Sequence, residues 1–236
     1  MRTMSFQLMM GRASANCRRF IPVIESRVLS GFIFSLTVVV SLANLPVAEA
    51  ALPEFDRVRI LTKPPQISNG ELTDYNGQSF QLSSLQGRVA LIFFGFTNCP
   101  DVCPMGMEKM RRLAESGQID AGEVAYIMIS VDGERDTPEV MKAYVQGFSK
   151  QFVGLTGAPA QVKRIAKSFS AAFFKEGGAE QGGAYSVSHS PQIFVVDQGG
   201  RLRAEFYNAS IEAMAGVTQA LLQEEPVVST GQGNEK

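Results

Sequence analysis

Two nearly continuous apolar runs constrain the fold of this 236-residue chain more than any other feature: "RVALIFFGF" at 88–96 and "EVAYIMISVD" at 123–132. A strand that is apolar on both faces has to be covered on both faces, which is typical of parallel strands inside an α/β sheet. Between the runs lies "MGMEKMRRLAESG" at 105–117, a helical segment that stops at a glycine. Because parallel strands need such a crossover, we expect a three-layer α/β domain.

The remaining segments predict further elements of the same domain. The segment "ELTDYNGQSFQLSSLQG" at 71–87 carries the Asn-Gly signal of a tight hairpin. A second hairpin is expected from the runs at 191–197 and 201–209, which flank Gln-Gly-Gly. The glycine-rich segment at 175–184 follows neither the strand nor the helix period and is predicted to be a mobile loop. A short strand is expected at 152–157, and helices at 135–148 with Asp136 or Thr137 as N-cap, at 159–173 and at 210–223.

These elements predict one domain at 70–223 with a central mixed sheet and an N-terminal hairpin. A loose lead-in at 51–69 precedes the domain, and a tail at 224–236 is predicted to be disordered.

The first 50 residues read as an export signal. Five arginines stand against one glutamate before "GFIFSLTVVVSLA" at 31–43, and "AEA" ends the segment at residue 50. A basic region, an apolar core and small residues at the end are typical of a secretory signal peptide. The uncharged run is also long enough for a retained membrane anchor. In both cases we expect the domain to be exported to the periplasmic side, soluble or associated with the membrane through its N-terminus.

Charge and cysteine content exclude several functions. The whole chain has a net charge of −1, and its acidic excess grows without the arginine-rich first 50 residues, so nucleic acid is not an expected partner. Only three cysteines are present, and Cys17 lies in the export segment. The domain therefore keeps Cys99 and Cys103, too few for a disulfide scaffold.

Cys99 and Cys103 lie in "GFTNCPDVCP", at the carboxyl end of a buried strand where a helix begins. Open α/β sheets place their chemistry there. A helix N-terminus favours a thiolate, so we expect lowered cysteine pKa values. A stapling disulfide would close a very short ring and stabilise little. A closed zinc site needs four ligands, and the domain offers two cysteines and one histidine. Two thiolates with one imidazole suit copper better.

His189, the only histidine, precedes an apolar strand and follows the glycine-rich segment. A lone histidine is usually a surface or satisfied core residue. In a thioredoxin-like layout, however, the strand that starts near Pro191 runs beside the cysteine loop, and His189 would overhang that loop. Other candidates rank lower. Met105, Met107 and Met110 are expected to fill the core or to be secondary ligands at most, Asp101 is expected in an outer shell or without a role, and Arg135 and Asp136 at a helix start.

Four segments together, "FFGFTNCPDVCP", "SVDGERDTPEVMKAY", "VGLTG" and "YSVSHSPQIFVVDQGGRLRAEF", resemble the Sco/SenC family over about residues 70–223. The resemblance implies a thioredoxin-like fold and a part in assembling the copper sites of cytochrome c oxidase. It implies that Cys99, Cys103 and His189 bind copper as Cu(I) or Cu(II), and that Asp132 lies near the metal. The implied partner is cytochrome c oxidase subunit II or another copper acceptor protein.

The chain departs from the family pattern at three positions. Gly133 stands where the family usually has proline, and Ser188 where an aspartate commonly precedes the histidine. We expect Gly133 to leave the loop that carries Asp132 more flexible, and Ser188 to leave the imidazole without an orienting acid. Pro191 stands where this family often has another residue and where thioredoxins have a cis-proline, so Ser190–Pro191 is expected to be cis.

Two functions remain open. The first is a copper metallochaperone that binds one copper ion through Cys99, Cys103 and His189 and passes it to a partner. The second is a thiol–disulfide oxidoreductase in which Cys99 and Cys103 form the redox-active pair and reduce cysteines of a partner protein. His189 discriminates between them, because a dithiol oxidoreductase does not need an imidazole. A peroxidase is a weaker third hypothesis, since only the local Thr-Asn-Cys run is similar to a peroxiredoxin.

Overall fold

The computed structural model describes residues 57–120, 122–177 and 185–224. Eight strands form one mixed sheet, in the order β1-β10-β9-β4-β5-β6-β2-β3. The strands of this sheet are β1 (Val58–Ile60), β2 (Glu71–Asp74), β3 (Ser79–Gln81), β4 (Val89–Gly95), β5 (Val124–Ser130), β6 (Phe152–Thr156), β9 (Ile193–Val196) and β10 (Leu202–Phe206). The helices are η1 (Leu82–Leu85), a 3-10 helix, and α2 (Val102–Glu115), α3 (Pro138–Phe148), α4 (Pro159–Ser168) and α5 (Ile211–Gln223).

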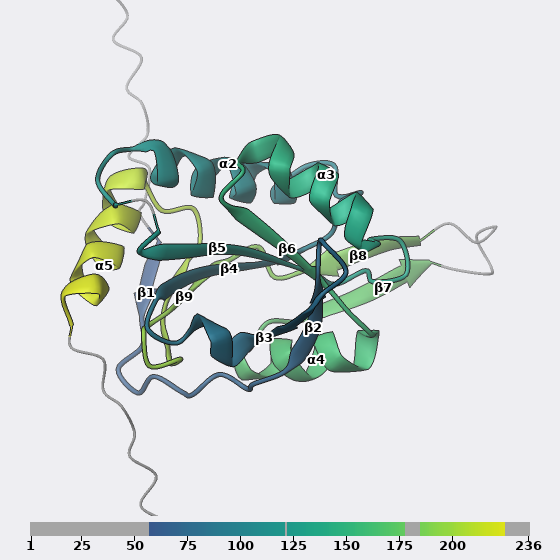
Figure 1. Ribbon diagram of the computed structural model, residues 1–236, viewed down its shortest axis with the longest axis horizontal. Coiled ribbons are helices and arrows are strands. Elements are labelled where there is room, and N and C mark those ends of the chain that lie inside the picture. The colour runs from purple at the N-terminus through teal and green to yellow at the C-terminus, as the bar shows by residue number, and fades with distance from the viewer. Residues whose placement is uncertain (1–56, 121, 178–184, 225–236) are drawn as a thin grey trace, which may run out of the picture. The chain divides into compact units, whose positions relative to one another are not determined.

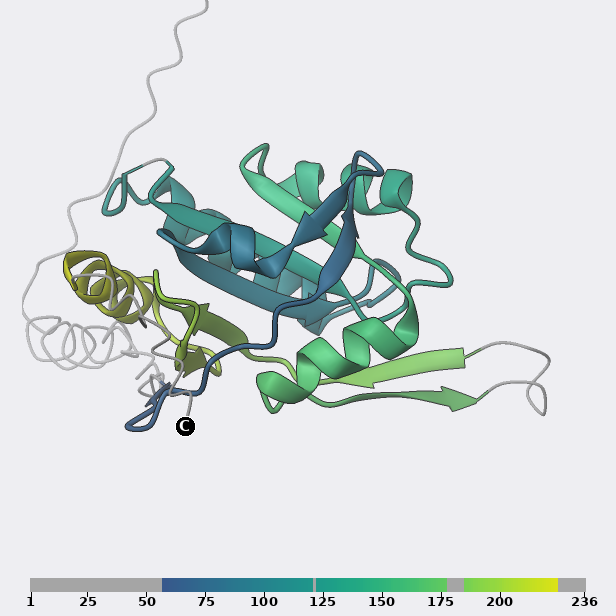
Figure 2. The same cartoon turned by 60° about the horizontal axis from the view of Figure 1, so that its bottom comes forward.

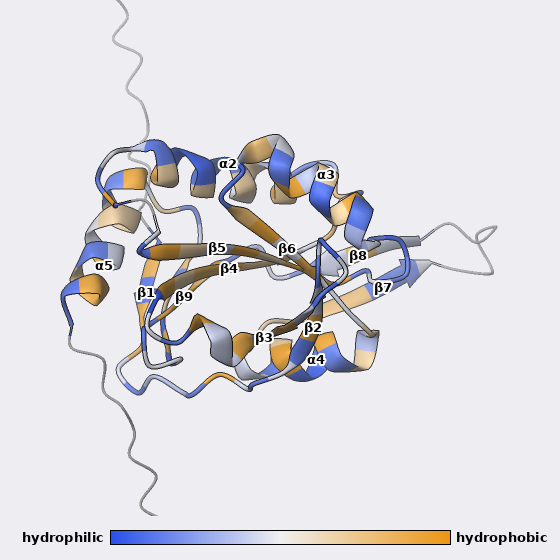
Figure 3. Cartoon of the chain, viewed as in Figure 1, coloured by the Kyte–Doolittle hydropathy of each residue, from blue (hydrophilic) through white to orange (hydrophobic). Residues whose placement is uncertain are grey.

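The two apolar runs form the centre of the sheet, as predicted. Strands β4 and β5 are parallel, and every residue of both is buried. Helices α2 and α3 cover one face and α4 covers the other (Figure 1). The hydrophobic colour is concentrated on β4, β5 and β6, whereas α2 and α3 alternate between hydrophilic and hydrophobic colour along their length (Figure 3). The α/β class and the three layers are therefore confirmed.

The predicted hairpins are also present. β2 and β3 pair around a turn in which Gly77 has a φ of 79°, a conformation that glycine adopts without strain. β9 and β10 pair antiparallel, and β9 also pairs with β4. The final sheet order thus places the residues that precede β9 beside the end of β4, where the cysteines lie.

Three predicted elements differ from the structure. The predicted helix at 159–173 ends at Ser168, because Ser170 adopts a left-handed φ of 56°. The lead-in at 51–69 contains β1, which pairs with β10. The segment 175–184 was predicted to be irregular throughout, but its first residues belong to β7 (Phe173–Gly177), which pairs with β8 (Tyr185–His189) as a separate two-stranded ribbon. Residues 178–184 lie outside the described part of the chain.

The β7–β8 ribbon extends away from the main sheet beside α4 (Figure 2). The chain then runs from β8 through 190–192 into β9 without a turn. No peptide bond of the described residues is cis, so the expected cis Ser190–Pro191 bond is wrong. Trans is the isomer of lower energy before proline, and the extended connection requires no other.

The predicted signal or anchor at 1–50 and most of the predicted tail at 224–236 lie outside the described residues. Within the described part of the chain, no helix is long and apolar enough to cross a membrane.

Candidate metal centre

The cysteine loop connects the carboxyl end of β4 to α2. Helix α2 begins at Val102, earlier than the sequence predicts, so Cys103 lies in its first turn and Cys99 in the loop before it. Gly95 ends β4, and a Cβ there would lie 2.8 Å from the Cys103 Sγ. The absence of a side chain at Gly95 therefore lets the Cys103 sulfur pack against the end of the strand. Both cysteines are free thiols, Cys103 is fully buried, and Cys99 is nearly so.

Asp136 holds the cysteine loop in place. The Thr97 backbone N–H donates to its Oδ2 at 3.0 Å, and the Thr97 hydroxyl donates to its Oδ1 at 2.6 Å. The Ser130 hydroxyl, at the end of β5, also donates to Oδ2 at 2.6 Å. The carboxylate is fully buried, and these donors satisfy it. Of the two predicted N-cap residues of α3, Thr137 caps the helix by accepting from the Val140 N–H. Asp136 instead connects the loop after β4 to the end of β5.

His189 ends β8 and directs its imidazole at both thiols. Its Nε2 lies 3.1 Å from the Cys103 Sγ and 3.9 Å from the Cys99 Sγ. Its Nδ1 lies 3.0 Å from the Ser190 carbonyl oxygen, which can only accept, so Nδ1 carries the proton in this hydrogen bond. In the neutral imidazole, Nε2 then presents its lone pair to the sulfurs. The rings of Phe93 and Phe96 make T-shaped contacts with the imidazole at centroid distances of 5.8 and 5.7 Å.

The three side chains form one compact donor set. One ligand atom from each of Cys99, Cys103 and His189 lies within 4.8 Å of the other two, and this is the only such group of three among the described residues. Two sulfurs and one nitrogen suit Cu(I), and the imidazole also suits Cu(II). A closed structural zinc site needs a fourth ligand, which this cluster does not include. The donor set therefore fits copper.

Burial controls the protonation of the site. Desolvation raises the pKa of the Cys103 thiol well above its ordinary value, and a hydrogen bond with the Phe96 backbone offsets only part of the increase. Desolvation also lowers the pKa of His189, although hydrogen bonds with the Ser190 and Phe94 backbones oppose this. The expected lowering by the helix N-terminus is thus wrong for Cys103, because burial outweighs the helix dipole. A metal bound by the Cys103 thiolate has to displace its proton, so binding releases protons.

Asp132 belongs to a latch that attaches the β8 strand to the loop before α3. We define the Asp132 latch as Asp132, Arg135 and Tyr185. The Tyr185 hydroxyl donates to Asp132 Oδ1 at 2.6 Å, and Arg135 forms an ion pair with the same carboxylate. The Arg135 guanidinium lies 3.9 Å from the Tyr185 ring centroid, and its Nη1 donates to the Tyr185 carbonyl at 3.3 Å. Tyr185 opens the strand that His189 ends, so the latch holds the other end of the strand that carries the imidazole.

Comparison with known proteins assigns the family. The family model described as SCO1/SenC matches residues 62–223. The chain belongs to this family. A SCO2-like protein of Rickettsia typhi is 36% identical over 137 residues, which make up 58% of this chain and 68% of that protein. A putative copper-binding protein of Stutzerimonas stutzeri is 37% identical over 171 residues, or 71% of this chain and 82% of that protein.

Solved Sco structures share the fold. Copper-bound ScoI of Bradyrhizobium japonicum has a TM-score of 0.60 and 34% identity, and the match covers 66% of this chain and 99% of that structure. Copper-bound yeast Sco1 has a TM-score of 0.63 and 27% identity, and the match covers 73% of this chain and 97% of that structure. The thioredoxin-like fold predicted from the Sco/SenC resemblance is confirmed.

The structure accounts for two departures from the Sco pattern. A Cβ on Gly133 would lie 2.3 Å from the Gly157 carbonyl oxygen, so this close backbone approach leaves no room for a side chain. The loop is also held by the Asp132 latch, which does not support the greater flexibility expected from glycine. Ser188 donates to Glu176 across the β7–β8 ribbon at 2.8 Å. The imidazole is oriented by the Ser190 carbonyl, a backbone group that sequence reasoning missed.

The residues predicted as lower-ranking metal-site candidates have different positions in the structure. Met107 and Met110 are fully buried core residues, whereas Met105 is 54% exposed. Asp101 is exposed at the start of α2 and makes no side-chain capping bond. Asp132 is not in the donor set with the cysteines. Sequence reasoning missed the parts played by Asp136, whose position after Arg135 suggested only a helix start, and by Tyr185, for which no local signal existed.

Proposed function

We propose that this Sco-family protein is a copper metallochaperone that binds one copper ion through Cys99, Cys103 and His189. It passes the ion by ligand exchange to the copper centre of cytochrome c oxidase, with subunit II as acceptor. The observation that carries the proposal is the orientation of His189, whose Nε2 lone pair faces both sulfurs while its Nδ1 is bound to a carbonyl. A copper site with only two cysteines needs such a third donor, whereas a dithiol reaction does not require one.

The copper-bound Sco structures support this choice of metal. We further propose that the domain acts on the periplasmic side of a membrane, after export by the segment at 1–50. The basic and apolar composition of that segment supports the proposal.

A thiol–disulfide oxidoreductase is the second candidate. Two free thiols lie together here, and Cys99 is the less deeply buried of the two. In this reaction the Cys99 thiolate attacks a partner disulfide, and Cys103 resolves the mixed disulfide. The partner gains two electrons and two protons, while Cys99 and Cys103 become a disulfide. The raised pKa of Cys103 disfavours its thiolate and slows the resolving step.

Replacement of the imidazole tests both functions. The purified reduced protein should bind one Cu(I) and one Cu(II) per chain, the latter with a thiolate-to-copper absorption band. His189→Ala should keep most of its Cu(I) affinity, because two thiolates hold a soft ion. It should lose stable Cu(II) binding, because two Cu(II) ions accept the two electrons released when the unassisted thiolates form a disulfide.

Ser188→Ala is the matched control, because Ser188 neighbours the imidazole but bonds to Glu176. It should bind both ions like the parent. If His189→Ala also binds Cu(II) like the parent and still supports oxidase assembly, the metallochaperone proposal is wrong. If His189→Ala instead loses assembly while its activity on a partner disulfide persists, copper transfer is the function that matters.

A further inference from the structure

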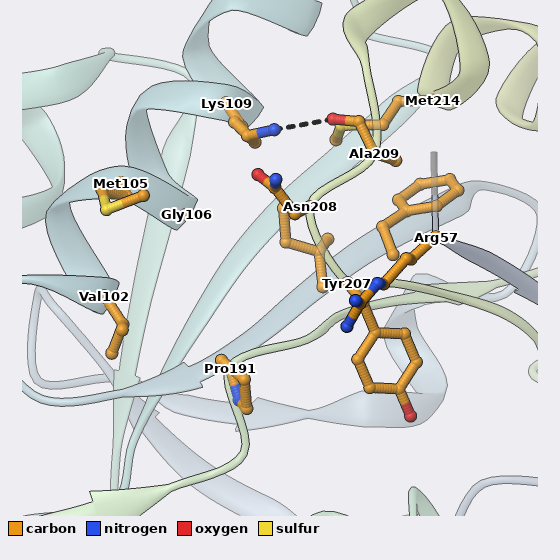
Figure 4. Close-up of a pocket in the computed structure, with 12 residues that line it drawn as sticks. Arg57, Val102, Met105, Gly106, Lys109, Pro191, Tyr207, Asn208, Ala209 and Met214 are labelled. Carbon is orange, nitrogen blue, oxygen red and sulfur yellow. Dashed lines mark hydrogen bonds between the residues drawn. The ribbon is translucent and has the colours of Figure 1, made fainter. Parts of the chain in front are cut away.

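An apolar groove of about 300 Å³ adjoins the metal centre. We define this groove by its rim, Val102, Met105 and Pro191, and by its floor, which includes Ile193, Phe206 and Met214. Figure 4 shows that Val102 and Met105 project from α2 on one side, and that Pro191 and the segment at 207–209 lie on the other. The groove therefore lies between the cysteine-bearing helix and the strands that follow the histidine.

Two residues of the groove rim lie next to metal ligands along the chain. Val102 directly precedes Cys103, and Pro191 comes two residues after His189. Val102 is 39% exposed and Met105 is 54% exposed, although both are apolar. Exposed apolar side chains around a concavity are typical of an interaction site, and methionine adapts to partners of different shape.

The far end of the groove is polar and basic. Arg57 and Asn208 line it, and the Lys109 ammonium donates to the Ala209 carbonyl at 2.8 Å (Figure 4). Arg57 is exposed, so its guanidinium remains accessible to an acidic group. An apolar centre with a polar, charged margin is the usual anatomy of a protein interface.

Copper transfer by ligand exchange requires that the donor atoms of the acceptor reach the ion while Cys103 and His189 still hold it. The acceptor therefore has to cover surface near these two residues, and the groove is lined by Val102 and Pro191, which lie next to them along the chain. We propose that the groove docks a loop of the copper acceptor, which inserts one large apolar side chain and places a carboxylate beside Arg57. This inference rests on the proposed metallochaperone function. The copper keeps its oxidation state, because its bonds to the cysteines and histidine are exchanged for bonds to the acceptor.

The test compares copper transfer to a protein with transfer to a small molecule. The Cu(I)-loaded protein is mixed with the metal-free, reduced copper domain of cytochrome c oxidase subunit II, or with a small Cu(I) chelator that needs no docking. Met105→Glu places a charge on the groove rim, and Arg57→Glu reverses the charge at its far end. Val140→Glu is the matched control, because Val140 is 40% exposed on α3 and does not line the groove.

We expect Met105→Glu to slow transfer to the protein acceptor by about tenfold, as expected for a residue central to an interface. Arg57→Glu should slow it less, and its effect should shrink as the salt concentration rises. Transfer to the chelator should stay at the parent rate for both variants, and Val140→Glu should behave like the parent in both assays.

Four results would overturn the docking proposal. If Met105→Glu and Arg57→Glu transfer copper to the protein acceptor at the parent rate, the groove is not the docking surface, although the metallochaperone function stands. If both variants slow transfer to the chelator equally, they disturb the metal centre and not an interface. If the parent does not transfer copper to the acceptor at all, the proposed function fails, and the docking proposal with it. Dimerisation of the parent that Met105→Glu abolishes would assign the groove to a second copy.

Discussion

Tyr185→Phe removes one hydroxyl group from the Asp132 latch and leaves the aromatic ring in place. In the parent this hydroxyl donates to a carboxylate that is only 1% exposed, at 2.6 Å. The ring still packs against the Arg135 guanidinium, so the substitution isolates one charge-assisted hydrogen bond. Because Tyr185 and His189 are the two ends of β8, loosening Tyr185 should also loosen the imidazole.

A hydrogen bond to a charged group contributes about 1.5–3 kcal/mol to the free energy of unfolding. The ion pair with Arg135 continues to neutralise the Asp132 carboxylate, so the cost should be near the lower end of that range. For a domain of this size, about 1.5 kcal/mol corresponds to a melting temperature lowered by roughly 3–6 °C. Loss of a group that orients a metal ligand typically lowers metal affinity by about tenfold or more. We expect this loss for Cu(II), whereas Cu(I) affinity, which depends on the two thiolates, should change little.

Tyr207→Phe is a close control, because the Tyr207 hydroxyl also donates at 2.6 Å to a buried carboxylate, that of Glu205, which pairs with Arg59. Thermal unfolding and Cu(II) titration of both variants separate stability from orientation. Both should lose similar stability, and only Tyr185→Phe should lose Cu(II) affinity. Equal Cu(II) affinity in the two variants would show that the Asp132 latch does not position His189.

Three further changes test other parts of the structure. Asp136→Ala leaves the Thr97 N–H and the hydroxyls of Thr97 and Ser130 without their acceptor, so denaturant titration should show a free energy of unfolding lower by about 3 kcal/mol. A decrease below about 1 kcal/mol would contradict this account. Gly133→Ala forces a Cβ to within 2.3 Å of the Gly157 carbonyl, which should lower the free energy of unfolding by about 1–3 kcal/mol, whereas unchanged stability would show that the backbone relaxes freely. Burial acts to raise the pKa of Asp197, but hydrogen bonds from two arginines outweigh it and hold the pKa below its ordinary value. The stabilisation by the Asp197 carboxylate is therefore present above about pH 4 and is lost as the pH falls through the folded-state pKa. Asp197→Asn should remove this acid-dependent part from a plot of unfolding free energy against pH. An unchanged slope of that plot at acid pH would refute the role of Asp197.

Local sequence was sufficient for the elements whose signals are local. The apolar runs became β4 and β5 because a strand buried on both faces has no polar alternation to preserve. The Asn76-Gly77 pair became a hairpin turn because glycine adopts positive φ without cost. The predicted order of strands and helices placed the cysteines at the carboxyl end of a central strand, and a thioredoxin-like layout placed His189 above the same loop.

The β7–β8 ribbon could not be predicted from local sequence. A glycine-rich segment has low strand propensity, yet Lys175 and Gly177 pair with residues of β8. Strand pairing takes its stability from a partner that can be distant in sequence, so composition alone does not decide it. The early end of α4 was missed for the same reason, because the chain turns at Ser170 to enter β7, whose partner strand is distant in sequence.

The sequence predicts which residues are the candidate metal ligands, but it does not predict their chemical state. Two cysteines and one histidine suit copper because soft sulfur and imidazole donors are properties of the side chains themselves, and the Sco/SenC resemblance implies that Cys99, Cys103 and His189 are the ligands. Protonation and orientation depend on what surrounds those side chains after folding. The tertiary structure alone buries Cys103 and raises its pKa, and binds the His189 Nδ1 to a carbonyl. It alone brings Asp136 to the cysteine loop, because desolvation and hydrogen bonding are set by neighbours far apart along the chain.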